Sequence, residues 1–502
     1  MNSDKIFLAI DQSTSATKAI LFTPEGKILD QESASHQQIY PKAGWVEHDA
    51  EEIFCNTLTT ASVLLQRNPE KAKNLLALSI TNQRETFVLF DRETGQPIYN
   101  AIVWQCRRGD DYCKQLVSEG KEKIVHELTG LKIDTYFPAS KLHWLLASRP
   151  DIRAKLKNGS VLFGTIETYL IYRLTKGKVY ASDHTNASRT LFYDIEKLEW
   201  SQELCKAFGL EFGELPEVYE SCNLFGETEL GGYLDHSIPI CGVIGDSQSA
   251  LFAQRCFATG EAKVTFGTGS SVMLNIGNKK RLSNVGTVTA LAWVLKGQPT
   301  YAFEGITNFT GATLVWMRDQ LQLISDPAET EAISQLVPDT NGVYLVPAFV
   351  GLGSPYWRAD ARAAILGMTP STTRAHVVRA GLESIGYVIT DTLKAMAEEA
   401  GGNINLIHAD GGAVRNKVLM QFVADLNQLE VHAAQTPELS ALGAVFNGCI
   451  GMGIFSSLED LEKLASDFCE YKPSMSPAHA NELFAGWQSA VCQVLYKPKI
   501  EK

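Results

Sequence analysis

A polar loop at residues 11–18 has the composition of a phosphate-binding turn. Two apolar runs, Ile6–Ile10 and Ala19–Phe22, flank it and predict a tight hairpin of buried strands. Small hydroxyl residues let backbone N–H groups approach an anion, and Lys18 adds a positive charge. Asp11, at the end of a strand, can meet a magnesium ion directly or through water. We therefore expect this loop to hold the phosphates of Mg-ATP; an ordinary polar hairpin turn is the alternative.

A candidate general base follows the apolar run Ile240–Ile244. This predicted strand ends in Gly245-Asp246, and we expect a helix to begin near Ser249. An aspartate at such a switch can take a proton from an acceptor hydroxyl. It can equally be a simple helix N-cap.

Side chains that suit a polyhydroxyl ligand follow two further predicted strands. Arg84 and Glu85 come after the buried run Leu75–Ile80, while Trp104 and Tyr136 lie in later polar clusters. A carboxylate accepts hydrogen bonds from hydroxyls, a guanidinium donates to them, and an aromatic face covers the C–H side. The rival interpretations are a surface salt bridge between Arg84 and Glu85 and two ordinary core aromatics.

The elements that position these residues follow an α/β pattern. In the first half, three hairpin-like strands, a helix with Asp49 and Glu52 at its N-terminus and the strand at Leu75–Ile80 are typical of a ribonuclease-H-like unit. Ligands of α/β proteins bind at the carboxyl ends of such strands.

The second half repeats the theme. The turn TFGTGSS (265–271) resembles the first loop in chemistry, so we place the domain boundary near Ala253, giving domains 1–253 and 254–502. We expect a loop entering a helix at Gly305–Asp319, a strand at Val343–Phe349 and another at Ile404–Ala409. The last ends in a Gly-Gly turn, which lets the backbone approach a ligand closely. No GxxxxGK[ST] motif is present, and three separated glycine/hydroxyl turns favour a nucleotide clamped between two domains.

Composition narrows the class of protein. The chain has 502 residues, of which 45% are hydrophobic and 20% charged, and a net charge of −12. This charge disfavours nucleic-acid partners and anionic membrane surfaces, and no apolar run is long enough to span a bilayer. The ten cysteines are scattered without a Cys-x-x-Cys pair, and the ten histidines show no metal-ligand spacing. We therefore expect a cytoplasmic enzyme with reduced thiols, no membrane insertion and no nucleic-acid partner.

Together the motifs resemble those of the FGGY carbohydrate kinase family, and within it most closely the glycerol kinases. The segments that carry the resemblance span nearly the whole chain: DQSTSATKA, YPKAGWVEHD, ITNQRET, PIYNAIVWQCRR, FGT with TNASRT, GDSQSALF, TFGTGSS, GVYLVPAF with GLGSPYW, and DGGAVRN. The resemblance implies an α/β fold with two ribonuclease-H-like domains, of the actin/hexokinase type, that close over ATP and substrate. We also expect a homodimer or higher homo-oligomer.

The resemblance also implies site residues. It implies contacts to Mg-ATP by Thr14, Ser15, Ala16, Lys18, Thr268, Gly311, Gly412 and Asn416. It implies a polyol site at Arg84, Glu85, Trp104, Tyr136, Asp246 and Ser247, with Asp246 as the base and Mg²⁺ near Asp11. The implied reaction is direct in-line transfer from ATP to a terminal hydroxyl of a small polyol, glycerol in the first place.

Five positions depart from the usual pattern. Ser13 replaces a glycine of the family, and Lys18 replaces the arginine usual in glycerol kinases. Ser247 and Ser271 replace a glutamine and a phenylalanine on the acceptor side, and Val315 replaces a glutamine that usually reaches toward the nucleotide. A kinase for a C4–C5 polyol or ketose (erythritol, erythrulose or xylulose type) is therefore the alternative. An actin- or Hsp70-like ATPase is a third possibility, but it has no use for the acceptor cluster.

Overall fold

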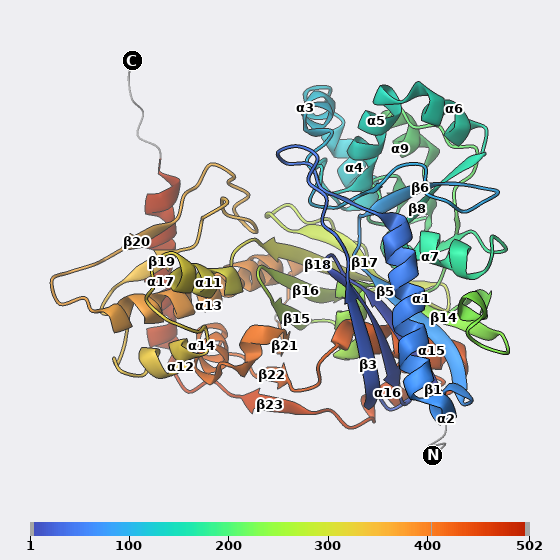
Figure 1. Ribbon diagram of the computed structural model, residues 1–502. Coiled ribbons are helices and arrows are strands. Elements are labelled where there is room, and N and C mark those ends of the chain that lie inside the picture. The colour runs from blue at the N-terminus through green and yellow to red at the C-terminus, as the bar shows by residue number, and fades with distance from the viewer. Residues whose placement is uncertain (1–4, 403, 497–502) are drawn as a thin grey trace.

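Two large β-sheets form the frame of the molecule (Figure 1). The computed structural model describes residues 5–402 and 404–496. The first sheet has the strand order β13 (Leu224–Thr228), β14 (Ile238–Gly245), β5 (Leu75–Asn82), β1 (Ile6–Gln12), β2 (Ala16–Phe22), β3 (Ile28–Ser35). The β1–β2 hairpin is antiparallel, as the sequence predicts, and β1, β5 and β14 run parallel. The polar residues that follow these three parallel strands therefore meet at one edge of the sheet.

The second sheet repeats the arrangement. Its order is β17 (Val288–Leu295), β18 (Gln298–Thr307), β16 (Ser270–Gly277), β15 (Glu261–Phe266), β21 (Leu406–Asp410), β22 (Val431–Ala434), β23 (Phe468–Tyr471). The central β15 pairs antiparallel with β16 and parallel with β21, just as β1 pairs with β2 and β5. This repetition agrees with the predicted pair of ribonuclease-H-like α/β units.

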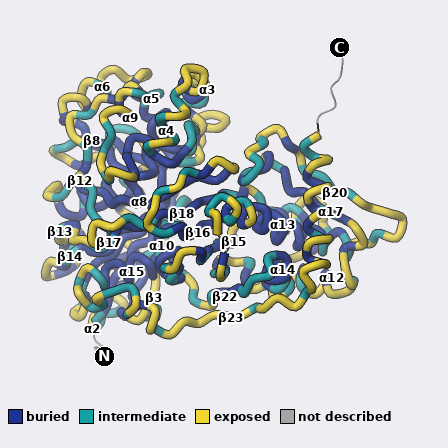
Figure 2. The backbone as a smooth tube through the Cα atoms, turned by 180° about the vertical axis from the view of Figure 1, so that it is seen from behind, coloured by how far each residue is buried: buried dark blue, intermediate teal, exposed yellow. Residues whose placement is uncertain are grey.

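Two helices, α10 (Asp246–Ala253) and α15 (Leu439–Gly451), lie between the sheets. Their apolar side chains share one cluster with Phe7 of β1 and Met273 of β16. Because α10 follows a strand of the first sheet and α15 follows a strand of the second, each half of the chain supplies one helix to this shared layer. The opposite faces are covered by α1 (Ala50–Arg67) and α7 (Ile166–Leu174) on the first sheet and by α13 (Arg374–Ala400) and α14 (Lys417–Asn427) on the second. The sheets and the middle layer form the dark, buried interior in Figure 2.

A third sheet supports a lobe of short helices at the upper right of Figure 1. Its strands are β4 (Glu47–His48), β7 (Ala101–Ile102), β6 (Phe87–Asp91) and β8 (Val161–Thr165). The helices of this lobe are α3 (Asp110–Ser118), α4 (Glu122–Thr129), α5 (Pro138–Ser148), α6 (Pro150–Lys157) and α9 (Gln202–Ala207).

The remaining elements are short or peripheral. The two-stranded sheets pair β9 (Ala181–Asp183) with β12 (Glu217–Tyr219), β10 (Tyr193–Asp194) with β11 (Glu199–Trp200), and β19 (Tyr344–Val346) with β20 (Ala364–Leu366). The other helices are α2 (Pro69–Ala72), α8 (His184–Ala187), α11 (Gly311–Asp319), α12 (Glu329–Ser334), α16 (Leu458–Glu462), α17 (Pro477–Leu495) and the 3₁₀ turns Leu230–Gly232 and Gly412–Arg415.

Several boundaries differ from those expected. The helix expected near Ser249 begins at Asp246, and the first three residues of the expected loop at Gly305–Asp319 belong to β18. The strand expected at Val343–Phe349 shortens to three residues of β19, because it pairs only with the short β20. The helix start at Asp49 is confirmed: its carboxylate accepts from the backbone N–H groups of Glu51 and Glu52.

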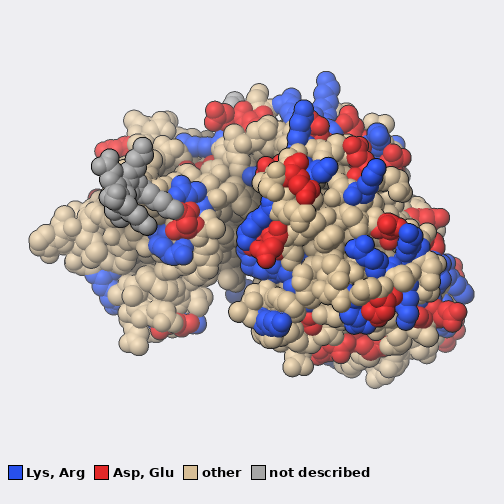
Figure 3. All heavy atoms as spheres, turned by 90° about the horizontal axis from the view of Figure 1, so that it is seen from above, with Lys and Arg blue, Asp and Glu red and all other residues tan. Residues whose placement is uncertain are grey.

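The surface and the thiols agree with the composition. Side chains of both charge signs are interspersed over the face seen in Figure 3, which is hollowed between a smaller and a larger part of the molecule. The ten cysteines, all within the described residues, are free. In the described part of the chain, no helix combines the length and hydropathy needed to cross a membrane.

Candidate active site

A cavity of about 780 Å³ is bordered by residues of both large sheets and of the helical lobe. It brings together all six predicted acceptor residues and residues from the first two of the three predicted phosphate turns: Arg84, Glu85, Trp104, Tyr136, Asp246 and Ser247, with Thr14 and Thr268. These positions are far apart in the sequence, so the two-sheet architecture is what assembles the cavity.

Asp246 occupies the first turn of α10, and its carboxylate is about two-fifths exposed. The helix N-cap is Gly245, so the interpretation of Asp246 as the N-cap is wrong. Oδ1 accepts from the backbone N–H of Ser247 at 2.6 Å and lies 3.0 Å from Nε of Arg84. Within the described residues, Oδ2 has no recorded partner. One carboxylate oxygen is thus held in place while the other remains available to a hydroxyl.

Arg84 and Glu85 are buried and do not form the surface salt bridge considered above, so that interpretation is wrong. Arg84 donates through Nη1 to Oε1 of Gln248 at 3.0 Å and through Nη2 to Oε1 of Glu304 at 2.7 Å. Glu85 accepts from Nε of Arg189 at 2.6 Å. Its φ of 62° is unusual for a residue with a side chain, and such backbone strain concentrates at functional sites.

Trp104 and Tyr136 form an aromatic wall of the cavity, with ring centroids 5.2 Å apart. The Trp104 indole N–H donates to the hydroxyl of Thr14 at 3.0 Å, so this wall is hydrogen-bonded to the loop at residues 11–18. Behind the wall, the Lys141 ammonium contacts the carbonyl oxygens of Val103, Trp104 and Tyr136 at 3.1, 3.4 and 3.2 Å. Burial lowers the pKa of Lys141 to about 8. This buried cation fixes both aromatic segments relative to each other.

The first loop is closed by its own hydroxyl and joined to the second half of the chain. The Ser13 hydroxyl donates to the carbonyl of Ala16 at 2.9 Å, while Ser15 is exposed. Nζ of Lys18 contacts both carboxylate oxygens of Glu438 at 2.7 and 2.8 Å. Glu438 is the N-cap residue of α15. An incoming phosphate would therefore share the Lys18 ammonium with an existing carboxylate.

Asp11 is the next-to-last residue of β1 and is buried. Its pKa is raised to about 7, mainly by burial and also by the carboxylates of Glu438 and Asp246, with Lys18 acting in the opposite direction. A buried carboxylate that resists ionisation, with two other carboxylates near it, fits a site for a divalent cation, which would relieve the repulsion between them. Among the described residues no cluster of three or more His, Cys, Asp or Glu side chains could enclose a metal. Mg²⁺ in proteins keeps several waters and takes one or two carboxylates plus phosphate oxygens, so Asp11 could serve as one of its ligands.

The turns of the second half meet at the carboxyl ends of β15 and β21. The N–H of Gly311, at the start of α11, donates to Gly267 O at 3.0 Å, and the Thr268 carbonyl accepts from the N–H of Ala312 at 3.0 Å. A Cβ on Gly411 would lie 2.4 Å from the Phe266 carbonyl, whereas a Cβ on Gly412 would meet nothing within 4 Å. Gly412 therefore faces open space beside the Thr268 turn.

Two further residues of the predicted nucleotide region have clear positions. Asn416 caps α14 by accepting from the N–H of Leu419 at 3.0 Å, and its amide donates to Thr330 Oγ1 at 3.1 Å. Val315 is 40% exposed on α11. Of the eight predicted nucleotide residues, Thr14 and Thr268 line the cavity of 780 Å³, and the other six lie outside its lining.

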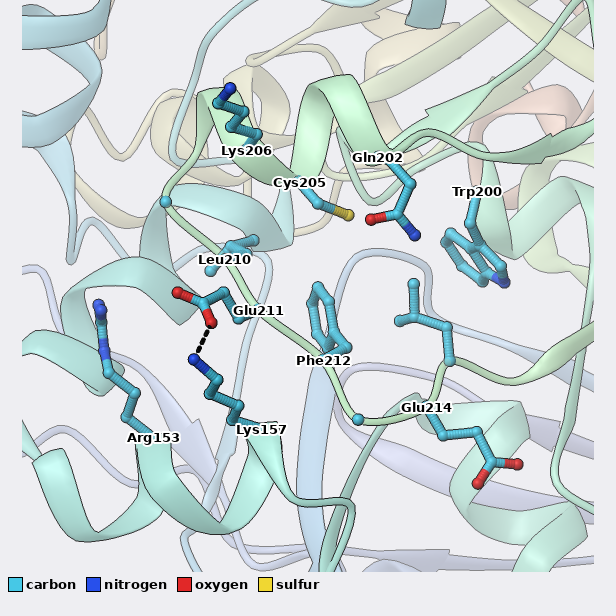
Figure 4. Close-up of a pocket in the computed structure, with 13 residues that line it drawn as sticks. Arg153, Lys157, Trp200, Gln202, Cys205, Lys206, Leu210, Glu211, Phe212 and Glu214 are labelled. Carbon is cyan, nitrogen blue, oxygen red and sulfur yellow. Dashed lines mark ion pairs between the residues drawn. The ribbon is translucent and has the colours of Figure 1, made fainter.

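A separate cavity of about 1020 Å³ lies between α6, α9 and the segment 209–215 (Figure 4). Lys157 pairs with Glu211 at 2.5 Å on its wall, and Trp200 and Phe212 contribute aromatic surface. Its thiol, Cys205, is buried, and burial raises the pKa of Cys205 to about 11. A thiol in that state is a poor nucleophile at neutral pH, so we place the active site in the cavity between the sheets.

Sequence reasoning missed four buried polar or charged side chains around the site: Arg189, Glu304, Gln248 and Lys141. A signal existed for two of them. Glu304 is a lone carboxylate within the apolar strand YAFEGIT, and Arg189 lies in the segment TNASRT. A buried strand tolerates a charge only when a partner neutralises it, so such a residue marks an unseen ion pair.

Comparisons with known proteins agree with this geometry. Residues 6–253 match the N-terminal domain of the FGGY family of carbohydrate kinases, and residues 262–452 match its C-terminal domain. The chain is 45% identical over 488 residues to glycerol kinase 1 of Thermotoga maritima (97% of this chain, 99% of the relative). It is 43% identical over 489 residues to a glycerol kinase of Shewanella oneidensis, with the same coverage. It superimposes with a TM-score of 0.93 on Plasmodium falciparum glycerol kinase with ADP, at 35% identity and coverage of 98% and 99%.

Proposed function

The chain belongs to the FGGY family of carbohydrate kinases, and from this premise we propose that it is a glycerol kinase. It would transfer the γ-phosphoryl group of ATP to a terminal hydroxyl of glycerol, producing glycerol 3-phosphate and ADP. The observation that carries the proposal is the position of Asp246 beside Arg84, in a cavity that Thr14 and Thr268 also border. The identity to named glycerol kinases over 97% of the chain supports the choice of acceptor.

In this mechanism the free Oδ2 of Asp246 accepts or orients the proton of the attacking hydroxyl. The contact between Oδ1 and Arg84 keeps the carboxylate from rotating. Arg84 and Glu85 hold the neighbouring hydroxyls, and Trp104 and Tyr136 cover the carbon chain. Positioning and charge stabilisation supply most of the rate enhancement in phosphoryl transfer.

The nucleotide would lie between the first loop and the turns of the second sheet. We assign it to Thr14, Ser15, Ala16 and Lys18 on one side and to Thr268, Gly311, Gly412 and Asn416 on the other. Asp11 would hold Mg²⁺, with Asp246 nearby. When bound, Mg²⁺ neutralises negative charge on the phosphate oxygens. Lys18 remains paired to Glu438, so it supports the loop as well as the phosphate.

A kinase for a C4–C5 polyol or ketose is the second candidate. The observation in its favour is that Ser247 and Ser271 both line the cavity, where they leave more room than longer side chains would. An actin- or Hsp70-like ATPase is disfavoured, because a polymer or chaperone has no small acceptor to bind with Arg84, Glu85 and Asp246.

Three further assignments belong to the proposal. The boundary between residues 253 and 254 is supported by the family matches, which end at 253 and resume at 262. We place the enzyme in the cytoplasm because its ten cysteines are free. We also propose a homodimer or higher homo-oligomer, to be tested by sedimentation velocity.

The function is tested by measuring ADP release from ATP and Mg²⁺ in the presence and absence of glycerol. Glycerol-dependent release with stoichiometric formation of glycerol 3-phosphate supports the proposal. Release that depends on erythritol, erythrulose or xylulose but not on glycerol would favour the second candidate.

A further inference from the structure

A chain of five alternating charges connects the acceptor residues Asp246 and Glu85. Glu304 lies at its centre: Oε1 is 2.7 Å from Nη2 of Arg84, and Oε2 is 2.6 Å from Nη1 of Arg189. At the ends, Arg84 contacts Asp246 at 3.0 Å and Arg189 contacts Glu85 at 2.6 Å. The two outer carboxylates are those we assign to the acceptor, and Glu304 sets the separation between the arginines that hold them.

Glu304 and Arg189 border the same cavity, but neither side chain exposes surface. Both side chains have 0% exposed surface, whereas the Asp246 side chain is 39% exposed. Because the pair contacts Arg84 and Glu85 directly, we expect it to act on the reaction through the positions of these two residues.

The electrostatics make Glu304 a fixed anion. Burial opposes its ionisation, but Arg189 and Arg84 outweigh burial and lower the pKa of Glu304 to about 2. Removing this charge would leave two buried guanidinium groups without their shared partner, a strongly unfavourable state. Each would then turn toward its remaining carboxylate, which would displace Asp246 and Glu85.

The five charged residues come from both halves of the chain. Arg84, Glu85 and Arg189 come from the first half of the chain, whereas Glu304 belongs to β18 of the second sheet. That sheet also carries the Thr268 and Gly412 turns that we assign to the nucleotide. The arginines are therefore spaced correctly only while the second sheet keeps its position against the first half.

We propose that Glu304 and Arg189 are positioning residues for the acceptor, and that Glu304 couples the nucleotide-bearing sheet to the acceptor site. The proposal rests on the kinase function proposed above. A shift of about an ångström at a reacting group can lower kcat/KM roughly 100-fold, so small changes at Glu304 should have large effects on acceptor use.

The test compares two variants. Glu304→Gln removes the negative charge. Glu304→Asp keeps the charge but, because its side chain is one methylene shorter, moves the carboxylate away from the two arginines. Glu383→Gln is the matched control. Glu383 is also buried, and its carboxylate lies 2.7 Å from the guanidinium of Arg379. This pair is not part of the cavity lining. For each protein we would measure the Tm, the Kd for ADP by calorimetry, and kcat and KM for glycerol and ATP.

We expect both Glu304 variants to lose roughly 100-fold in kcat/KM for glycerol while the Kd for ADP changes less than about threefold. Glu383→Gln should lower the Tm without this acceptor-specific loss. In wild type, ADP should tighten glycerol binding, and Glu304→Asp should abolish that coupling.

Three results would overturn the inference. One is a Glu304→Asp variant with near-normal kcat/KM for glycerol. Another is a loss of ADP affinity as large as the loss of kcat/KM for glycerol. The third is an unchanged effect of ADP on glycerol binding.

If Glu304→Gln fails to fold, Glu304→Asp and Arg189→Lys decide by the same criteria. If wild type itself shows no polyol-dependent turnover, the proposed function fails first, and that result is distinguishable because no variant is needed to obtain it.

Discussion

Nε of Arg84 lies 3.0 Å from Oδ1 of Asp246, and the same oxygen accepts from the Ser247 N–H at 2.6 Å. The carboxylate is thus anchored through one oxygen. Because Arg84 is in turn held by Gln248 and Glu304, the orientation of Asp246 also depends on these two residues.

Replacement of Asp246 by Asn should keep the size of the side chain but remove its ability to take a proton. We expect kcat to fall by roughly 10²–10⁴-fold, the usual contribution of a general base, while the Kd for ADP changes little. Steady-state kinetics with glycerol and calorimetry with ADP check this. A variant with near-normal kcat would remove Asp246 from the mechanism.

Asp11→Asn should make the free enzyme more stable at pH 8. The pKa of Asp11 is raised from 3.8 to about 7 in the fold, so between these values the folded protein keeps a proton that the unfolded chain loses. The free energy of unfolding therefore falls as pH rises through this range, by about 1.4 kcal/mol per unit, and the penalty is complete above pH 7.

Urea unfolding in EDTA at pH 4, 6 and 8 tests this sign. The Asp11→Asn variant should match wild type near pH 4 and exceed it at pH 8, while its Mg²⁺-dependent turnover falls. A variant less stable than wild type at pH 8 would contradict the assigned environment of Asp11.

Gly412→Val should obstruct the nucleotide and not the acceptor. The space around a Cβ at Gly412 is open, so the fold should accept the side chain, but the backbone could no longer approach the nucleotide closely. We expect the KM for ATP to rise far more than the KM for glycerol. Gly402→Val is the control, because its Cβ also meets nothing within 4 Å. Equal effects on both substrates would count against the placement of Gly412.

The acceptor preference should respond to the two serines in the cavity wall. Ser247 is partly exposed, whereas the Ser271 hydroxyl is buried and has no hydrogen-bond partner in the described structure. One methylene of misfit costs about 1–3 kcal/mol in discrimination. The double variant Ser247→Gln, Ser271→Phe should therefore gain kcat/KM for glycerol relative to erythritol, erythrulose, ribitol and xylulose. If wild type prefers glycerol and the variant gains nothing, the serines do not set the size of the pocket.

The sequence predicted the parts of the site that are local. The β1–β2 hairpin and the strand before Asp246 follow from short apolar runs, and their polar ends carry residues that we assign to the reaction. The sequence could not predict which side chains contact those groups, because tertiary packing decides which charged residues form ion pairs. Arg84 and Glu304 are 220 positions apart, and Lys18 and Glu438 are 420 apart. Periodicity also could not show that Arg84 and Glu85 are buried, since a buried ion pair and a surface loop have the same local composition.

The most direct test of the account is acceptor-dependent ATP turnover by the wild-type enzyme. ADP release would be followed with Mg-ATP alone and with glycerol, erythritol, erythrulose, ribitol or xylulose, and the phosphorylated product identified by ³¹P NMR. We predict low basal turnover, strong stimulation by glycerol, one glycerol 3-phosphate formed per ADP, and loss of that stimulation in Asp246→Asn. Strong basal turnover that no polyol changes would contradict the kinase mechanism and favour an ATPase.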